Sequence, residues 1–304
     1  MKILLATQKP FSTVAVDKMK EIAKNTSNDL ILLESYKEKS EIENAVKNAD
    51  ALIVRSDKVT ADVVSASNNL KIVVRAGAGY DNVDLEACSK KSIVVMNTPG
   101  QNSNAVAELT LGFMIYMSRN SFTPGTGTEL KGKKLGIHAY GNVGKLVASL
   151  GKGFGMEIYA FDPFVSEETF KNEGVIQIKT AKQLYSECDI ISINIPAIAS
   201  TIKSINKELL SDLKKGAMLI NTARKEVINE QDLFDIMKNR TDIKYATDIK
   251  PDSHEQMLEF GSRYFATPNK MGAETEEANV NAAVAAITQI ADFFNTGNEK
   301  YRVN

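Results

Sequence analysis

The 304-residue chain has no tryptophan, two cysteines and two histidines, and it contains no long uncharged hydrophobic run. Cys88 and Cys188 stand far apart and lack the paired spacing of a zinc or redox motif, so we predict inert thiols and no metal site. No stretch approaches the roughly eighteen apolar residues of a membrane span, and the first apolar run is too short for a signal peptide. We therefore expect a cytoplasmic protein without a membrane partner.

An excess of charge of one sign is also missing, because 37 Lys and Arg residues are balanced by 38 Asp and Glu residues. A near-neutral chain has no strong field for a phosphate polymer, so we expect no nucleic-acid partner. The length is enough for two domains, since domains usually hold about 100 to 150 residues each.

The most informative stretch, residues 135–162, reads as a strand, a glycine turn, a helix from near Val143, a second strand and an acid. Gly141 and Gly144, which have no side chains, are expected to let the backbone turn tightly and to let a pyrophosphate approach the amides at a helix N-terminus. Asp162, about twenty residues further on, can accept hydrogen bonds from a ribose 2′-hydroxyl and repel a 2′-phosphate. The pattern therefore favours NAD over NADP.

This fingerprint is incomplete, because Ala139 occupies the first glycine position of G-x-G-x-x-G. An ordinary turn between a strand and a helix is the alternative, and the flanking strand, helix and acid favour cofactor binding over it. We expect the single methyl group of Ala139 to be tolerated.

Apolar strands alternate with amphipathic helices along the chain, which indicates parallel sheets covered on both faces. We predict an α/β fold with two doubly wound domains and a ligand cleft between them. A helix at 102–118 bridges the domains, 119–130 is a loop, 274–294 is a long helix, and 301–304 returns to the first domain. The predicted strands span 2–7, 30–34, 51–55, 71–76, 93–97, 135–138, 156–162, 175–178, 189–195, 217–223, 244–249 and 264–266, and the predicted helices include those beginning at 12, 40, 60 and 230.

Several blocks of residues, taken in order, resemble the D-2-hydroxyacid dehydrogenase family, and the ending is most like its D-3-phosphoglycerate dehydrogenases in a short form without a regulatory domain. The resemblance implies NAD-dependent hydride transfer in a homodimer. It also implies a Rossmann-like NAD domain, 99–284, inserted in a flavodoxin-like substrate domain, 1–98 with 285–304. The blocks are Val74–Asp84, Asn97–Pro99, Ala105–Leu109, the glycine turn, Leu219–Arg224 and Met271–Ala278.

Oxidation of a 2-hydroxy acid needs a cation for the carboxylate and a base for the hydroxyl proton. Arg224 follows a predicted strand end, where doubly wound sheets display functional groups, and its guanidinium can hold a carboxylate in a fixed fork. The alternative is a surface salt bridge. We assign Arg224 as the catalytic cation.

Arg55 and Arg75 also follow strand ends and suit a phosphate group, with ion pairs as the alternative. By resemblance, Arg55, Ser56 and Arg75 bind substrate, while the backbone of Ala76, Gly77, Ala78 and Gly79 meets its carboxylate. Asn102 completes the predicted substrate set. The resemblance places the following residues at NAD: Tyr140, Gly141, Asn142, Val143, Gly144, Asp162, Pro163, Ile195, Pro196, Thr222, Ala223, Asp248, Gly272 and Ala273.

The chain departs from the family at the active-site histidine and glutamate, where it reads Thr267–Gly272 and Asp248–Asp252. We predict that Lys270 transfers the proton with Asp252 as its carboxylate partner, and Glu255 or His254, in a polar loop, could serve instead. His138 is expected to be a buried strand residue. The family's Trp-containing segment is replaced by the short loop 119–130, which puts its dimer contacts in doubt.

The leading functional hypothesis is oxidation of a small phosphorylated 2-hydroxy acid, D-3-phosphoglycerate, to 3-phosphohydroxypyruvate at the entry to serine synthesis. A hydroxypyruvate or glyoxylate reductase would use the same Arg224 and glycine turn. A non-catalytic NAD-sensing protein is the alternative from another class, and the missing histidine is its main support.

Overall fold

The computed structural model describes residues 1–304 and divides the chain into two compact units. Unit 1 comprises residues 1–102 and 274–304, and unit 2 comprises residues 103–273. These boundaries differ from the expected ones at 98/99 and 284/285. The difference arises because helix α12 (Glu276–Thr296) shares one hydrophobic core with α1 (Thr13–Asn25), so the whole helix belongs to unit 1.

Unit 1 contains a five-stranded parallel sheet in the order β2-β1-β3-β4-β5. This is a flavodoxin-like order, and its direction of winding switches between β1 and β3, where such sheets bind ligands. The strands are β1 (Lys2–Thr7), β2 (Asp29–Glu34), β3 (Ala51–Val54), β4 (Ile72–Arg75) and β5 (Val94–Asn97).

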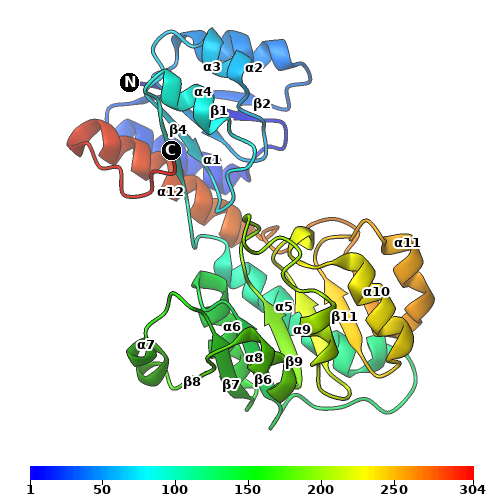
Figure 1. Ribbon diagram of the computed structural model, residues 1–304. Coiled ribbons are helices and arrows are strands. Elements are labelled where there is room, and N and C mark those ends of the chain that lie inside the picture. Colours follow the sequence, from blue (N-terminus) through cyan, green and yellow to red (C-terminus); the bar gives the residue numbers. More distant parts are fainter. The chain divides into compact units, whose positions relative to one another are not determined.

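Both faces of this sheet are covered by helices (Figure 1). Helices α1 and α12 cover one face, while α2 (Lys39–Ala45), α3 (Ala61–Ala66) and α4 (Leu85–Lys90) cover the other. Successive residues of β1, such as Ile3 and Leu4, enter different cores because side chains alternate along a strand. The C-terminal tail lies on β5, where Arg302 bridges Met96 in antiparallel fashion.

Unit 2 contains a seven-stranded parallel sheet in the order β12-β11-β10-β9-β6-β7-β8. Its winding switches direction between β6 and β9, as in Rossmann-like sheets. The strands are β6 (Lys134–His138), β7 (Glu157–Phe161), β8 (Ile176–Gln177), β9 (Ile190–Ile193), β10 (Met218–Asn221), β11 (Lys244–Thr247) and β12 (Tyr264–Ala266).

Helices cover both faces of this sheet as well. Ile190 packs into the core under one set of helices and Ile191 into the core under the other, so a continuous apolar strand serves two layers. The first set is α5 (Ser103–Ser118), α6 (Asn142–Gly153) and α7 (Glu167–Asn172), and the second is α8 (Ala181–Glu187), α9 (Lys207–Ser211) and α10 (Glu230–Asn239).

Two segments expected to be loops contain short helical turns. Within 119–130, residues Asn120–Phe122 form a 3-10 turn (η2), and three successive non-glycine residues have positive φ angles of 52°, 57° and 55°. Asn120 stabilises this turn, because its amide donates to Thr126 O at 3.0 Å and its side-chain oxygen accepts from Lys244 Nζ at 3.1 Å. His254 begins the short helix α11 (His254–Met257) instead of lying in a loop.

Both cysteines are buried, and burial raises the pKa of the Cys88 thiol to about 11 and that of Cys188 to about 12. Both thiols are therefore protonated near neutral pH, when they are poor nucleophiles. The chain holds no group of three or more His, Cys, Asp or Glu residues placed to bind a metal ion. None of its helices has the length and apolar character needed to span a membrane.

Candidate active site

The carboxyl ends of β6, β9, β10 and β11 form one row along the edge of the unit 2 sheet. Strand register places His138 beside Ile193, Ile193 beside Asn221 and Asn221 beside Thr247. The residues that immediately follow these strands therefore lie along the same edge. They include the glycine turn, Ile195, Thr222 to Arg224 and Asp248, which the sequence had placed in one site.

The tight turn after β6 falls on Ala139, which has a φ of +75°, whereas Gly141 has an ordinary φ of −85°. Our expectation that the glycines make the turn is therefore corrected, since the left-handed residue is an alanine. Such a conformation costs an alanine about 1 kcal/mol relative to glycine. The methyl group of Ala139 is tolerated at the cost of local strain.

Gly144 and Gly141 differ in whether the fold leaves room for a side chain. A Cβ at Gly144 would stand 2.3 Å from the carbonyl oxygen of Ala139, so the fold itself requires this glycine. A Cβ at Gly141 would meet nothing within 4 Å, so the protein alone does not require glycine there. No side chain caps α6, and its first turn holds no acidic residue. This open, uncapped N-terminus fits the pyrophosphate of NAD.

Asp162 follows β7 and braces the glycine turn. Its Oδ2 accepts a hydrogen bond from Tyr140 N at 2.8 Å, and its Oδ1 accepts from Phe164 N at 2.9 Å. A carboxylate has about four lone-pair sites, so both oxygens can still accept hydrogen bonds from ribose hydroxyls. The acid therefore fixes the turn and also remains able to bind the adenosine ribose.

Tyr140 points its side chain away from this edge and into the unit, where it is 2% exposed. Its hydroxyl donates to Glu173 Oε2 at 2.7 Å, and Lys145 Nζ pairs with Glu173 Oε1 at 2.6 Å. The hydrogen bonds from Lys145 and Tyr140 lower the pKa of the Glu173 carboxyl below its usual value. Tyr140 can therefore meet a cofactor only through its backbone, and Glu173 is a supporting residue that the sequence did not indicate.

His138 is a buried residue at the end of β6, which confirms the sequence prediction. Its Nδ1 lies 3.2 Å from the hydroxyl of Tyr185, and burial lowers the pKa of its imidazole to about 4. The ring is therefore neutral near pH 7. It supports the strand behind the glycine turn and has no role as the missing base.

The segment after β9 lies beside the glycine turn, because Asn194 N donates to His138 O at 2.9 Å. Ile195 is buried, whereas Pro196 and, across the edge, Pro163 are exposed. Thr201 shapes this segment by donating to Pro196 O at 2.5 Å and accepting from Ile198 N at 2.9 Å. Thr201 is a second supporting residue that carried no signal in the sequence.

Arg224 lies on a turn that Asn221 organises after β10. The Asn221 side chain donates to Arg224 O at 3.0 Å and accepts from Ala223 N at 3.0 Å. The half-buried guanidinium makes one hydrogen bond, from Nη1 to Ala223 O at 3.1 Å, and no carboxylate lies within ion-pair distance. The alternative of a surface salt bridge is therefore wrong for Arg224. Thr222, next on this turn, is buried and contacts Thr110 Oγ1 at 3.0 Å.

Asp248 is buried after β11 and holds the loop of residues 267–272. Its Oδ1 accepts from Met271 N at 2.8 Å and from Thr267 Oγ1 at 3.1 Å, and its Oδ2 accepts from Gly272 N at 2.7 Å. Gly272 has no room for a side chain, because a Cβ there would stand 2.9 Å from Asp248 Oδ2. Asp248 thus fixes the loop that carries Lys270. The side chain of Lys270 is exposed.

Asp252 has a different partner from the one we expected. Its side chain is 83% exposed and pairs with Lys225, and this hydrogen bond raises the pKa of the Lys225 ammonium. The structure therefore pairs Asp252 with the neighbour of Arg224 in place of Lys270. Among the alternatives, His254 also has a partner, since its Nδ1 lies 2.8 Å from the Tyr264 hydroxyl.

In unit 1, Arg55 follows β3 at the point where the winding of the sheet switches direction. Its Nη2 pairs with Glu274 Oε1 at 3.0 Å, and its guanidinium lies 5.8 Å from the ring centroid of Phe11. The ion-pair alternative that we weighed for Arg55 is therefore what the structure shows. Ser56, the next residue, is exposed.

The loop of residues 76–79 follows β4 and turns its carbonyl groups toward the protein. Gly77 O accepts from Thr98 N at 2.9 Å and Ala78 O accepts from Asn97 Nδ2 at 2.6 Å, whereas the amides of 77–79 donate to no protein atom. A Cβ at Gly77 would overlap Arg75 Nη1, only 1.5 Å away, so glycine makes room for that guanidinium. Amides and a cation converge here as an anion requires. Asn102, also in the predicted set, is half-buried at the end of this segment of unit 1.

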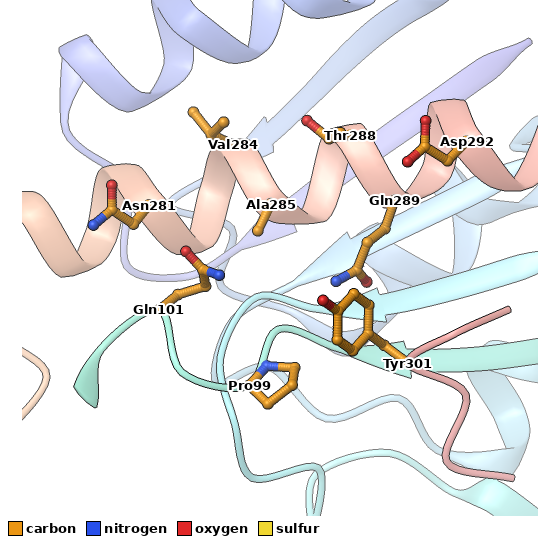
Figure 2. A pocket seen from close by; sticks show the side chains of 9 residues that line it. All are labelled: Pro99, Gln101, Asn281, Val284, Ala285, Thr288, Gln289, Asp292 and Tyr301. Carbon is orange, nitrogen blue, oxygen red and sulfur yellow. The ribbon is translucent and has the colours of Figure 1, made fainter. Parts of the chain in front are cut away.

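A groove of about 330 Å³ runs along α12 in unit 1, and Figure 2 shows that Gln101, Gln289 and Tyr301 border it. Its lining consists of amide, hydroxyl, apolar and acidic side chains, and no lysine or arginine is among them. A site for an anionic substrate needs a cation. This groove therefore does not suit an anionic substrate.

Comparisons with known proteins agree with this geometry. The family profile described as "D-isomer specific 2-hydroxyacid dehydrogenase, NAD binding domain" matches residues 113–269. The D-3-phosphoglycerate dehydrogenase of Methanocaldococcus jannaschii is 35% identical over 269 residues, covering 83% of this chain and 51% of the relative. The chain thus spans about half the length of this relative. The hydroxypyruvate reductase of Thermotoga maritima is 34% identical, covering 86% of this chain and 90% of the relative.

Solved structures give the same result. The NAD⁺-bound 3-phosphoglycerate dehydrogenase of Entamoeba histolytica has a TM-score of 0.91 and 47% identity, covering 100% of this chain and 98% of that one. D-2-hydroxyisocaproate dehydrogenase has a TM-score of 0.84 at 22% identity and so supports the fold alone. The predicted α/β fold and the predicted NAD-binding domain are confirmed. The chain belongs to the D-isomer-specific 2-hydroxyacid dehydrogenase family.

Proposed function

We propose that the chain catalyses NAD-dependent oxidation of D-3-phosphoglycerate to 3-phosphohydroxypyruvate, the reaction that opens serine synthesis. The observation that carries this proposal is the half-buried guanidinium of Arg224, which has no carboxylate partner and lies along the same sheet edge as the NAD turn. A partly desolvated cation without a partner is suited to bind an anion. NAD, when bound, accepts the hydride that leaves C2 of the hydroxy acid.

Arg224 binds the carboxylate of the substrate and the oxygen on C2. Its planar guanidinium can donate to both groups at once, which fixes the direction in which C2 points. The turn held by Asn221 keeps this guanidinium in place before the substrate arrives. Orientation of the reacting carbon is the main contribution of Arg224 in this proposal.

Lys270 takes the proton of the C2 hydroxyl during oxidation and returns it during reduction. The family's histidine is absent, and Lys270 lies on the loop that Asp248 holds through Met271 N and Gly272 N. A lysine amine is one of the side chains that can serve as a general acid or base. Asp252 has no part in this proposal, because Lys225 neutralises it.

The phosphate is assigned to the cations of unit 1, Arg55 and Arg75, and the amides of residues 76–79 are assigned to an anionic group of the substrate. Support comes from the unused amides of this loop and from the guanidinium of Arg75 beside Gly77. Charge-assisted contacts of this kind are the usual way to bind phosphate. We also propose that Asp162 selects NAD over NADP and that the chain acts as a homodimer.

The assay is reduction of NAD by D-3-phosphoglycerate, followed as NADH absorbance, with Arg224→Gln and Lys225→Gln measured in parallel. Lys225 is a matched control, because it is the next residue, also cationic, and already paired with Asp252. We expect turnover in the wild type and in Lys225→Gln and a large loss in Arg224→Gln. Absence of NADH formation by the wild type in either reaction direction would refute the proposal and would favour a non-catalytic NAD-binding protein.

A second candidate, reduction of hydroxypyruvate or glyoxylate, is favoured by one specific observation. Arg55 is already neutralised by Glu274, which reduces the positive charge available for a phosphate. The Thermotoga relative named hydroxypyruvate reductase matches this chain over most of its own length. Under the first proposal, Arg55→Ala should lower kcat/KM for phosphorylated substrates alone. Under the second, it should leave kcat/KM unchanged for both phosphorylated and unphosphorylated substrates.

A further inference from the structure

Glu274 forms an ion pair with Arg55, the cation that the proposed function assigns to the substrate phosphate. Its Oε1 lies 3.0 Å from Arg55 Nη2, and no other carboxylate pairs with Arg55. The two side chains differ in exposure, because Arg55 is 14% exposed and Glu274 is 48% exposed. The acid is therefore the partner that can move into water, while the arginine stays in place.

The surroundings fix Arg55 more firmly than Glu274. Arg55 follows a central strand and lies against the buried ring of Phe11. Glu274 stands just before Thr275, which caps α12 by accepting from Ala278 N at 3.2 Å. The backbone at Glu274 is thus anchored, but its side chain makes only the one contact with Arg55.

We propose that Glu274 is a specificity-determining residue that yields Arg55 to a phosphate dianion and withholds it from a monoanionic carboxylate. This inference rests on the proposed function, in which Arg55 binds the phosphate of the substrate. Glu274 supplies a counter-charge to this partly buried arginine when no ligand is bound. Any anion that binds Arg55 must first displace this carboxylate.

The exchange favours phosphate because of its charge and geometry. Replacing Glu274 by another carboxylate substitutes one single charge for another, so little free energy is gained. A phosphate monoester carries about −1.5 to −2 charges at pH 7 and three strong acceptor oxygens. It can engage both terminal nitrogens of Arg55, whereas the Glu274 contact uses Nη2 alone. Glu274 therefore raises the binding free energy that an anion must gain at Arg55 in order to displace it.

The test uses Glu274→Gln, which keeps the side-chain shape and removes its charge, and Glu276→Gln as its control. Glu276 lies two residues further on, in the first turn of α12, and forms no ion pair. Calorimetry measures the Kd of inorganic phosphate for the full chain without NAD, and kinetics measure kcat/KM for D-3-phosphoglycerate and for D-glycerate. The double variant Arg55→Ala/Glu274→Gln shows whether any gain passes through Arg55.

We expect Glu274→Gln to tighten phosphate binding by about 1.5-fold to fivefold, the range of an ion pair that is partly exposed. It should also raise kcat/KM for D-3-phosphoglycerate and leave kcat/KM for D-glycerate unchanged, because D-glycerate has no phosphate to place at Arg55. Both gains should be absent from the double variant and from Glu276→Gln. Unchanged phosphate affinity in Glu274→Gln, or no measurable binding to any variant, would overturn the inference. If Glu274→Gln tightens phosphate binding as expected but no substrate is oxidised, the proposed reaction is wrong, whereas the displacement of Glu274 from Arg55 by phosphate is supported.

Discussion

The two units display arginines at the same place in similar sheets, yet the two side chains are in different states. Arg224 in unit 2 contacts only the carbonyl of Ala223, whereas Arg55 in unit 1 is paired with Glu274. In unit 2, Asp162 binds two backbone amides and Asp252 pairs with Lys225, and no carboxylate lies within ion-pair distance of Arg224. The difference shows that the partners of a strand-end cation, more than its position, determine what it can bind.

Substitution of Lys270 should give the largest effect, because we propose that it transfers the proton in the chemical step itself. We expect Lys270→Ala to lower kcat by about 10² to 10⁴, the usual contribution of general acid–base catalysis. NAD affinity should stay nearly unchanged. Kinetics in both reaction directions across pH check this, and near-native kcat throughout would exclude Lys270 as the proton carrier.

Removal of the Arg224 cation should have the next largest effect and sharpens the contrast with Arg55. Arg224→Gln is expected to lower kcat/KM by about 10² to 10³, as for loss of a preorganised charged donor. Asn221→Ala, which only releases the turn, should give a smaller loss of the same kind. If Arg224→Gln and the control Lys225→Gln have equal kcat/KM, the unpaired arginine has no catalytic role.

The buried His138 predicts how the stability of unit 2 depends on pH. Burial depresses the pKa of this imidazole from 6.5 to about 4, so between these values the unfolded chain binds a proton that the folded chain does not. Stability is therefore constant above pH 6.5 and falls, by about 3 kcal/mol from this group, as the pH drops to 4.

Urea unfolding at several pH values measures this dependence. His138→Leu should show a flatter loss of stability on acidification than the wild type. An identical slope of unfolding free energy against pH in His138→Leu and in the wild type would contradict the account.

Substitution of Asp162 tests its proposed role in binding the adenosine ribose of NAD. Asp162→Ala removes a charged acceptor and releases Tyr140 N and Phe164 N, so NAD affinity should fall by about tenfold to a hundredfold. Asp162→Asn retains an acceptor but removes the negative charge, so it should mainly improve NADP binding. Equal affinity of the wild type for NAD and NADP in calorimetry would remove this role from Asp162.

The smallest predicted effect concerns the strained alanine of the glycine turn. Ala139→Gly should stabilise unit 2 by about 0.5 to 1 kcal/mol, because glycine adopts a φ of +75° without steric cost, offset in part by its greater unfolded entropy. Thermal unfolding measures the change. A loss of stability would mean that Ala139 gains more from packing than it loses in strain.

The sequence predicts well those features that depend on local pattern. Alternating apolar strands and amphipathic helices predicted both parallel sheets, and the helices predicted to begin at 12 and 60 have Ser12 and Thr60 at their N-cap positions. The glycine turn and the strand-end position of Arg224 were predicted for the same reason. Each of these features depends on a pattern of neighbouring residues, so a short stretch of sequence is enough to predict it.

Features that depend on distant partners could not be predicted. The pairs Arg55–Glu274 and Lys225–Asp252 join residues far apart in sequence, and many other acids would have been equally plausible partners. The left-handed backbone of Ala139 could not be read from the residue itself, because an alanine seldom adopts a positive φ. The domain boundary at 273/274 followed from the packing of α12 on α1.

The most direct test of the central claim follows the hydrogen on C2 of the substrate. D-3-phosphoglycerate deuterated at C2 is incubated with NAD and the protein, and the cofactor is examined by NMR. The account predicts that the deuterium appears on the nicotinamide ring of NADH, once per turnover, and that Arg224→Gln greatly slows its appearance. NADH without deuterium, or equal transfer by Arg224→Gln and the wild type, would contradict it.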